Sequence, residues 1–178
     1  MTVALDIRLL HTAEEMSQVE SLQQAVWPGA DVEIVPAHLL LTAAHNGGLV
    51  AGAWAGERLA GFVFSFLGLH ETESARCLKH CSHQLGVHPD FRSAGVGYAL
   101  KTHQREHVLR QGLELITWTY DPLLARNAQL NRVYSQLVRL HQAACFCGCA
   151  ERCGTSVGMM KARLAGRGWN GGSGSAKA

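Results

Sequence analysis

The middle of the chain carries the segment Gly86-Val87-His88-Pro89-Asp90-Phe91-Arg92-Ser93-Ala94-Gly95-Val96-Gly97. We interpret it as the end of a strand, a turn and the first turn of a helix. Free backbone amides converge at such a helix start, where the helix dipole also favours negative charge. Glycines let the backbone approach a ligand closely. The segment therefore predicts a phosphate-binding loop.

Three kinds of phosphate-binding motif compete for this loop. A Walker loop needs Lys and then Ser or Thr directly after its last glycine, whereas Lys101 and Thr102 follow Leu100 here. A dinucleotide fingerprint needs Gly or Ala at the position of Leu100 and an acidic residue farther along, and the chain offers neither at the expected place. The third motif, a pyrophosphate loop of the form Arg/Gln-x-x-Gly-x-Gly/Ala after a strand that ends in Val-x-Pro, matches at every defining position.

That motif gives the chain its resemblance to a known family. Val87-His88-Pro89 and Arg92-Ser93-Ala94-Gly95-Val96-Gly97 are similar to the pyrophosphate loop of the GNAT superfamily of N-acetyltransferases. The context agrees, because a strand precedes the loop and a long helix, a further strand and an Asn-containing helix follow it. Asn127-Ala128 and Trp118-Thr119-Tyr120-Asp121-Pro122-Leu123 further resemble one subgroup of predicted GNAT proteins. The resemblance covers residues 6–131.

The order of the expected elements fits this family. Residues 6–10, 49–55, 59–67, 79–87 and 115–120 have the composition of strands, with residues 56–58 as the turn of a hairpin. A capping box of Thr12 and Glu15 begins the first helix, and further helices are expected at residues 36–45, 95–111 and 124–138. The resulting fold class is α/β (α+β), with a mixed sheet and helices on its faces. The resemblance specifies the acyl-CoA N-acyltransferase fold, whose twisted sheet is mostly antiparallel.

The resemblance also implies a cofactor site. Acetyl-CoA is expected in a cleft between the strands at 79–87 and 115–120, where the two strands splay apart. Its pantetheine arm would pair with backbone groups of Leu85 and Val87. The remaining expected contacts come from the loop amides and from the last helix: Arg92, Ser93, Ala94, Gly95, Val96, Gly97 and Asn127.

The implied reaction is direct transfer of the acetyl group to an amine. A lysine-like ammonium has a pKa of about 10.4 in water, so a base must remove a proton before the amine attacks. His83, Glu73 and Asp121 are candidate bases by their position. Tyr134 is the candidate proton donor to the leaving thiolate, although Val138 replaces the glycine of the family's Tyr-x-x-x-Gly pattern. A strand N–H is expected to face the developing oxyanion.

Two other functions stay open. His103-Gln104-Arg105-Glu106-His107 matches the H-x-x-E-H pattern of a group of zinc peptidases, which makes a zinc hydrolase using His103 and His107 the alternative enzyme. No third ligand is identifiable, and the cysteines form no paired C-x-x-C knuckles, so we expect no metal. A GNAT-like protein that binds CoA without catalysis is the other alternative, because cofactor binding uses mainly backbone groups.

The composition of the chain argues against secreted, membrane-spanning and nucleic-acid-binding proteins. The chain has 178 residues, 47% of them apolar, which suits one domain. The N-terminus lacks the features of a secretory signal, and the longest apolar run, residues 59–69, is too short to span a bilayer. We expect a cytoplasmic protein with reduced thiols, a small-molecule or peptide amine as substrate, and no nucleic-acid or membrane partner; a homodimer stays open.

The charge distribution places a boundary near residue 138. Residues 1–138 contain ten Lys/Arg and thirteen Asp/Glu, whereas residues 139–178 contain six and one. We therefore expect an acyltransferase domain at 4–138 and an atypical basic, Cys/Gly-rich tail at 139–178 that is flexible and lacks the family's terminal strands. Our hypothesis is that the reading frame changes near residues 132–138. An uninterrupted frame at the locus, with an intact mass matching this tail, would refute it.

Overall fold

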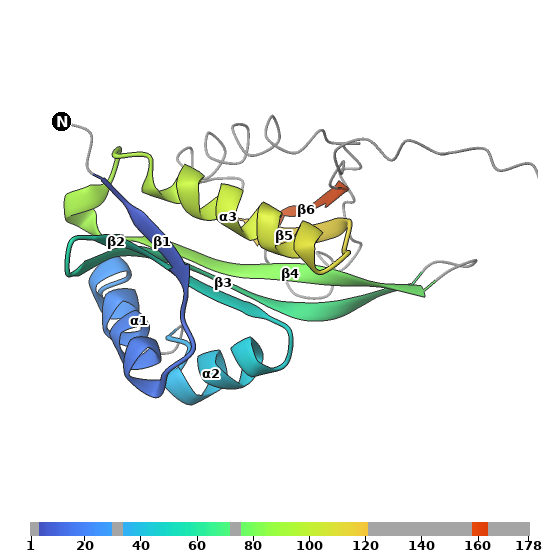
Figure 1. Ribbon diagram of the computed structural model, residues 1–178, viewed down its shortest axis with the longest axis horizontal. Coiled ribbons are helices and arrows are strands. Elements are labelled where there is room, and N and C mark those ends of the chain that lie inside the picture. Colours follow the sequence, from blue (N-terminus) through green and yellow to red (C-terminus); the bar gives the residue numbers. More distant parts are fainter. Residues whose placement is uncertain (1–3, 30–33, 72–75, 121–157, 164–178) are drawn as a thin grey trace, which may run out of the picture.

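The computed structural model describes residues 4–29, 34–71, 76–120 and 158–163 (Figure 1). Its elements in chain order are β1 (Asp6–Leu9), α1 (Ala13–Val26), α2 (Ala37–His45), β2 (Leu49–Ala55), β3 (Arg58–Glu71), β4 (Arg76–Val87), the 3₁₀ turn η2 (Pro89–Phe91), α3 (Val96–Arg110), β5 (Leu115–Tyr120) and β6 (Gly158–Arg163).

The described strands form one sheet in the order β1-β2-β3-β4-β5-β6. All neighbours are antiparallel except β4 and β5, which run parallel. A parallel pair needs a crossover connection, and η2 and α3 provide it. The predicted mixed, mostly antiparallel sheet flanked by helices is confirmed.

The first helix begins where the sequence places its cap. The Glu15 amide donates to Thr12 Oγ1 over 3.2 Å, and the Thr12 amide donates to Glu15 Oε2 over 3.1 Å. This reciprocal pair satisfies two amides that a helix start leaves without partners. The predicted helix at 36–45 is also confirmed, with Pro36 at its N-cap.

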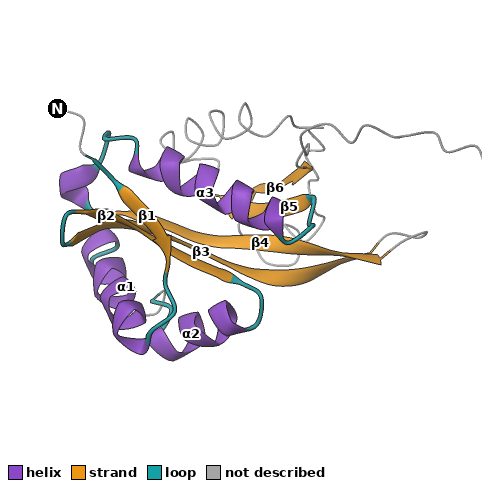
Figure 2. Cartoon of the chain, in the orientation of Figure 1, coloured by secondary structure: helices purple, strands orange, loops and turns teal. Residues whose placement is uncertain are grey.

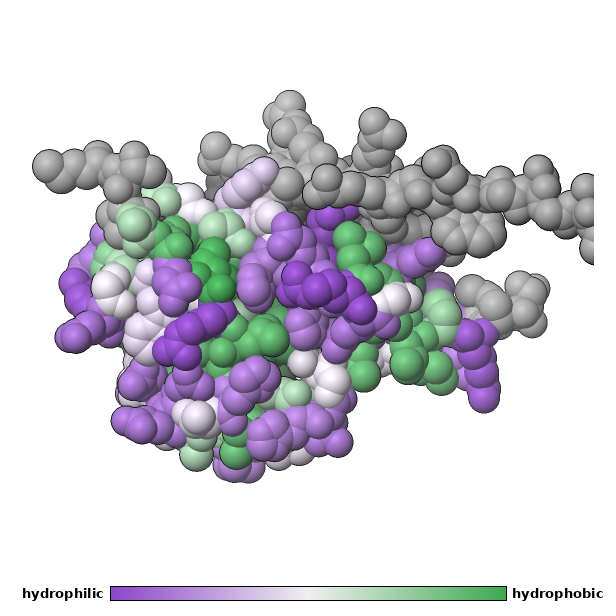
Figure 3. Space-filling model, viewed as in Figure 1, coloured by the Kyte–Doolittle hydropathy of each residue, from purple (hydrophilic) through white to green (hydrophobic). Residues whose placement is uncertain are grey.

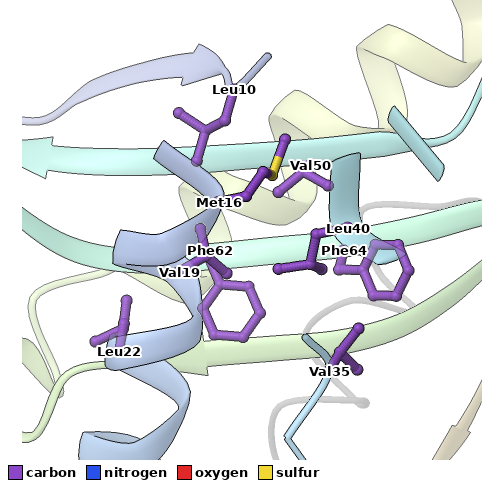
Figure 4. Close-up of a cluster of buried hydrophobic side chains, with 9 residues drawn as sticks. All are labelled: Leu10, Met16, Val19, Leu22, Val35, Leu40, Val50, Phe62 and Phe64. Carbon is purple, nitrogen blue, oxygen red and sulfur yellow. The ribbon is translucent and has the colours of Figure 1, made fainter. Parts of the chain in front are cut away.

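Helices cover both faces of the sheet (Figures 1 and 2). On one face α1 and α2 pack over β2 and β3, and the buried cluster drawn in Figure 4 lies between them; it consists of Leu10, Met16, Val19, Leu22, Val35, Leu40, Val50, Phe62 and Phe64. On the other face α3 buries Val96 and Leu100 against small residues of β2 and β3 such as Ala51 and Ala60. Full burial of each large apolar side chain contributes about 1.5–3 kcal/mol, so α3 is held firmly against the sheet.

β3 and β4 extend farther than the apolar pattern predicted. The sequence indicates strands at 59–67 and 79–87, whereas β3 continues to Glu71 and β4 begins at Arg76. Residues 69–71 pair with residues 76–78 and form a two-stranded ribbon beyond the helices (Figure 2). In this ribbon Leu69 faces Leu78 and each is 51% exposed, and Figure 3 shows apolar surface at this end of the molecule. Backbone pairing, which is independent of burial, explains the extra length.

β6 lies inside the segment that the sequence analysis expected to be a flexible tail. Its six residues pair with the whole of β5, from Leu115 opposite Arg163 to Tyr120 opposite Gly158. For these residues the expectation of a tail without a strand was wrong. A strand edge binds any segment that can present backbone donors and acceptors, so composition alone cannot reveal such pairing. The hypothesis about the reading frame stays a prediction.

The expected helix at 124–138 and the domain boundary at 138 lie outside the described residues. Among residues 4–29, 34–71, 76–120 and 158–163, no helix combines the length and apolar character needed to cross a membrane.

Candidate functional site

The parallel strands β4 and β5 separate near the middle of β4. Their register contains three pairs, His80 with Ile116, Cys81 with Thr117 and Ser82 with Trp118. β4 nevertheless continues to Val87 and β5 to Tyr120. Within the part of the chain that the structure describes, the edge of β4 after Ser82 therefore has no strand beside it on the β5 side.

A β-bulge lies at the same point. On β3, Phe64 pairs with Gln84 and the next residue, Ser65, pairs with Ser82, so His83 has no partner in the register. An inserted residue bends a strand and increases its twist. The bulge thus turns the second half of β4 away from the direction of β5 and opens the split.

Leu85 and Val87 face the open edge. The His88 amide donates to the Ala60 carbonyl over 2.9 Å, so the backbone of His88 points toward β3. Hydrogen-bonding directions alternate along an antiparallel pair. The backbone groups of Val87 and Leu85 therefore point away from β3, into the split, as the sequence analysis expected of the residues that pair with a pantetheine arm.

Two residues of the loop after β4 have a left-handed backbone. Ser93 has φ 69° and Gly95 has φ 78°, whereas Arg92 is extended, with φ −63° and ψ 144°. The amides of Arg92 and Ala94 donate to Pro89 and Phe91 carbonyls, each over 3.3 Å.

The other amides of this loop are available. Among the described residues, the amides of Ser93, Gly95, Val96 and Gly97 make no hydrogen bond. A Cβ built on Gly95 meets no atom within 4 Å, which leaves open space in front of the helix start. Free amides, open space and the positive end of α3 together fit a pyrophosphate group.

A polar cluster that the sequence analysis missed lies at the closed end of the split. Lys101 of α3 donates from Nζ to Ser82 Oγ over 2.6 Å and to Gln104 Oε1 over 3.0 Å. The same Nζ lies 5.7 Å from the centroid of the Trp118 ring. Burial lowers the pKa of Lys101 to about 7. The signal in the sequence was the spacing of Lys101, Gln104 and Val108, which puts a lysine next to the buried stripe of a helix.

A second polar network lies near the end of α3 and runs from buried Ser65 and His80 to exposed Gln111. His80 Nε2 donates to Gln111 Oε1 over 2.7 Å, because an amide oxygen can only accept, and Gln111 Nε2 donates to the Gly47 carbonyl over 3.0 Å. In the neutral imidazole, Nδ1 then accepts from Ser65 Oγ, 2.9 Å away. Burial lowers the pKa of His80, so this neutral form is favoured. Ser65 and His80 are both fully buried, so the pair joins β3, β4 and α3 rather than meeting a ligand.

His83 lies beside the split on the face of α1 and α2. Its ring contacts Phe64 and Phe66 at centroid distances of 5.7 and 5.9 Å. Desolvation by these neighbours lowers the pKa of His83, although part of the side chain stays exposed. Ser82, the preceding residue, bonds to α3, so His83 and Lys101 lie on opposite faces of β4.

The remaining candidates divide into two groups. Glu73, Asp121, Asn127 and Tyr134 lie outside the described residues. His103 and His107 lie on α3, where the His107 ring packs 6.1 Å from the His80 ring, and burial lowers the pKa of His107 to about 4. No three His, Cys, Asp or Glu side chains within the described ranges are grouped so as to hold a metal ion.

Comparison with solved structures defines the fold class. No protein-family model and no curated protein sequence matches the chain. Among solved structures, an acetyltransferase assigned to the GNAT family from Desulfovibrio desulfuricans is 16% identical, with a TM-score of 0.66 over 91% of this chain and all of the other.

Two further structures carry ligands. The PaiA N-acetyltransferase of Thermoplasma acidophilum, in complex with coenzyme A, is 15% identical, with a TM-score of 0.61 over 90% of this chain and 99% of that protein. An aminoglycoside acetyltransferase from an uncultured soil metagenomic sample, in complex with sisomicin, is 19% identical, with a TM-score of 0.62 over 72% of this chain and 86% of that one.

The chain therefore shares the overall fold of these acetyltransferases, with the split parallel pair and the loop at the start of α3 as parts of that fold. The chain has the GNAT fold, as the resemblance of its central loop implied.

Proposed function

We propose that the chain is an acetyl-CoA-dependent N-acetyltransferase that transfers an acetyl group directly to an amine. The observation that carries the proposal is that the open edge of β4 leads directly to the loop with free amides. The open edge of β4 ends at Val87, and the free amides of the loop begin at Ser93, so one extended molecule with a pyrophosphate at one end fits both.

Six of the nine residues expected from the sequence would hold acetyl-CoA in this proposal; the amides of Arg92 and Ala94 already bond within the loop, and Asn127 lies outside the described residues. Leu85 and Val87 supply backbone partners for the amide groups of the pantetheine arm. The amides of Ser93, Gly95, Val96 and Gly97 supply donors for the pyrophosphate. Bound in this way, acetyl-CoA would bring an activated acyl group into the split. The fold is shared with proteins crystallised with coenzyme A, which supports this choice of ligand.

The acceptor amine would approach from the face of α1 and α2. His83 lies on this face at the bulge, where its lowered pKa keeps the imidazole neutral at pH 7 and able to accept a proton. His83 would thus act as the base that readies the amine. The acceptor is a small-molecule or peptide amine in this proposal.

Calorimetric titration of the full chain with acetyl-CoA tests the proposal, with Gly95→Glu as the disrupting variant. Gly112 provides a matched control at the other end of α3, because it also has a positive φ (73°) and a built Cβ there also meets no atom within 4 Å. Both substitutions strain the backbone alike, but only Gly95→Glu puts a carboxylate against the pyrophosphate, a repulsion of several kcal/mol.

We expect acetyl-CoA to bind to the wild type and to Gly112→Glu, and binding to Gly95→Glu to be weaker by at least about a hundredfold. Equal affinity of all three proteins, or no binding by the wild type, would refute the assigned site. A panel of amines is then incubated with protein and acetyl-CoA, and thiol release is followed. Binding without acetylation of any amine would favour a CoA-binding protein without catalysis.

A further inference from the structure

The ammonium group of Lys101 is held at one defined point of the split. Its Nζ bonds to Ser82 of β4 over 2.6 Å and to Gln104 of its own helix over 3.0 Å, and it lies 5.7 Å from the Trp118 ring of β5. Ser82 and Trp118 are the last pair in the register of β4 and β5. The cation is therefore placed where the two strands begin to separate, on the face that α3 covers.

We propose that Lys101 faces the sulfur atom of the bound thioester and donates a proton to the thiolate as the thiolate leaves. This inference rests on the proposed function, because the split must hold acetyl-CoA for the sulfur to reach this position. The pyrophosphate loop lies at the start of α3 and Lys101 lies on the second turn of the same helix. Helix α3 thus carries hydrogen-bond donors both for the pyrophosphate and for the sulfur of one extended ligand.

The surroundings suit a cation that stabilises developing negative charge. Lys101 lies between α3 and the sheet. In a site with little water, a fixed positive charge stabilises a nearby negative charge more strongly than it would in bulk solvent. Two hydrogen bonds hold Nζ in place, so little reorganisation is needed when charge develops.

The acidity of this lysine also suits the transfer. A thiol has a pKa of about 8.5 in water, whereas an ordinary lysine has one of about 10.4 and would keep its proton in the presence of a thiolate. With a pKa of about 7, Lys101 is the stronger acid of the two. Beside the ammonium the pKa of the thiol also falls, so the two acidities lie close together and the proton can pass from nitrogen to sulfur.

The complete step balances. The amine nitrogen forms a bond to the carbonyl carbon, the carbon–sulfur bond breaks, and its electron pair stays on sulfur. Lys101 Nζ gives one proton to that sulfur, which yields the free thiol and a neutral lysine. The base on the opposite face takes the proton that the amine loses, and water restores the proton of Lys101.

The experiment measures the ionisation of the thiol of bound coenzyme A, which requires no acceptor. Ultraviolet absorbance of the thiolate is followed against pH in complexes of coenzyme A with the wild type, Lys101→Met, Lys101→Gln and Lys79→Met. Lys79 lies on β4 opposite Gly68, on the other face of the sheet, and serves as the control. Lys101→Gln keeps a donor for Ser82 and so preserves the packing if Lys101→Met does not fold.

An ammonium within about 4–6 Å of a thiolate lowers the pKa of the thiol by about 1–3. We expect the thiol to titrate at a lower pH in the wild type and in Lys79→Met than in either Lys101 variant, with at least about a tenfold difference in the ratio of thiolate to thiol. A thiol that titrates alike in all complexes would overturn the role of Lys101 while leaving the proposed function intact. Failure of coenzyme A to bind to the wild type, checked by calorimetry, would overturn the proposed function and this inference with it.

Discussion

Gly86 of β4 and Phe62 of β3 are paired across the sheet, and a Cβ built on Gly86 would overlap the fully buried ring of Phe62. The glycine is therefore required for packing rather than for backbone freedom. We predict that Gly86→Ala lowers the free energy of unfolding by about 1–3 kcal/mol, the usual cost of overpacking a core. Urea denaturation followed by circular dichroism measures the change.

A double-mutant cycle checks the cause of that loss. Phe62→Leu removes the ring that the new methyl group would meet, so the combined loss of Gly86→Ala and Phe62→Leu should be smaller than the sum of the two single losses by about 0.5 kcal/mol or more. Strictly additive losses would show that Gly86 matters for another reason, such as the conformation of the backbone.

The burial of His80 predicts that stability falls with acid. Because desolvation lowers the pKa of His80 in the folded chain, the unfolded chain binds the proton first as the pH drops through 6.5. The contribution of the neutral imidazole is complete above about pH 6.5 and is lost as the pH falls toward the lowered value. Urea midpoints at a series of pH values from neutral to mildly acidic measure this slope.

Other histidines contribute to the same slope, so a variant is needed to isolate His80. Desolvation also lowers the pKa values of His83, His103 and His107. We expect His80→Gln to be less stable at neutral pH, because Ser65 loses its acceptor, and to show a shallower decline below pH 6.5. A decline as steep as that of the wild type would assign the acid sensitivity to the other histidines.

The capping box predicts a local contribution to stability at the start of α1. Thr12→Ala removes the oxygen that accepts from the Glu15 amide, and we expect a loss of about 0.5–2 kcal/mol in the free energy of unfolding. Thr12→Ser retains that acceptor and should lose no more than a few tenths of a kcal/mol. An equal loss in both variants would point to the methyl group of Thr12 instead of its hydroxyl.

If His83 is the base, its substitution should slow turnover without weakening the binding of acetyl-CoA. With an amine that the acetylation panel identifies, His83→Gln should lower kcat by about a hundredfold or more and leave the affinity for acetyl-CoA unchanged. The rate of the wild type should fall with acid only below pH 6.5, because the pKa of His83 is lowered and its neutral form persists to that pH. His70→Gln is the control, since His70 lies farther along β3 in the exposed ribbon.

If His83→Gln retains full turnover, the base lies elsewhere, and Glu73 and Asp121 become the residues to substitute. A fall in acetyl-CoA affinity that matches the fall in kcat would instead mean that His83 shapes the split. Separate measurement of the two parameters distinguishes these outcomes.

The sequence alone determined the features that depend on neighbouring residues. The order of the elements through β5 and the cap of α1 each follow from side-chain chemistry within a few positions. The loop could be recognised for the same reason, since its amides come from six consecutive residues. Strand ends were less predictable, because β3 and β4 continue by pairing with each other beyond their apolar runs.

Only the tertiary structure decided what depends on contacts between distant segments. It placed β6 beside β5, it brought Ser82, Lys101 and Trp118 to one point, and it joined Ser65, His80 and Gln111 by hydrogen bonds. In the sequence Lys101 is one helix residue among others, and it becomes distinctive only where α3 crosses the split and withdraws its ammonium from water. Local propensity acts over a few residues, whereas burial and the pKa values that follow from it are set by the packing of the whole fold.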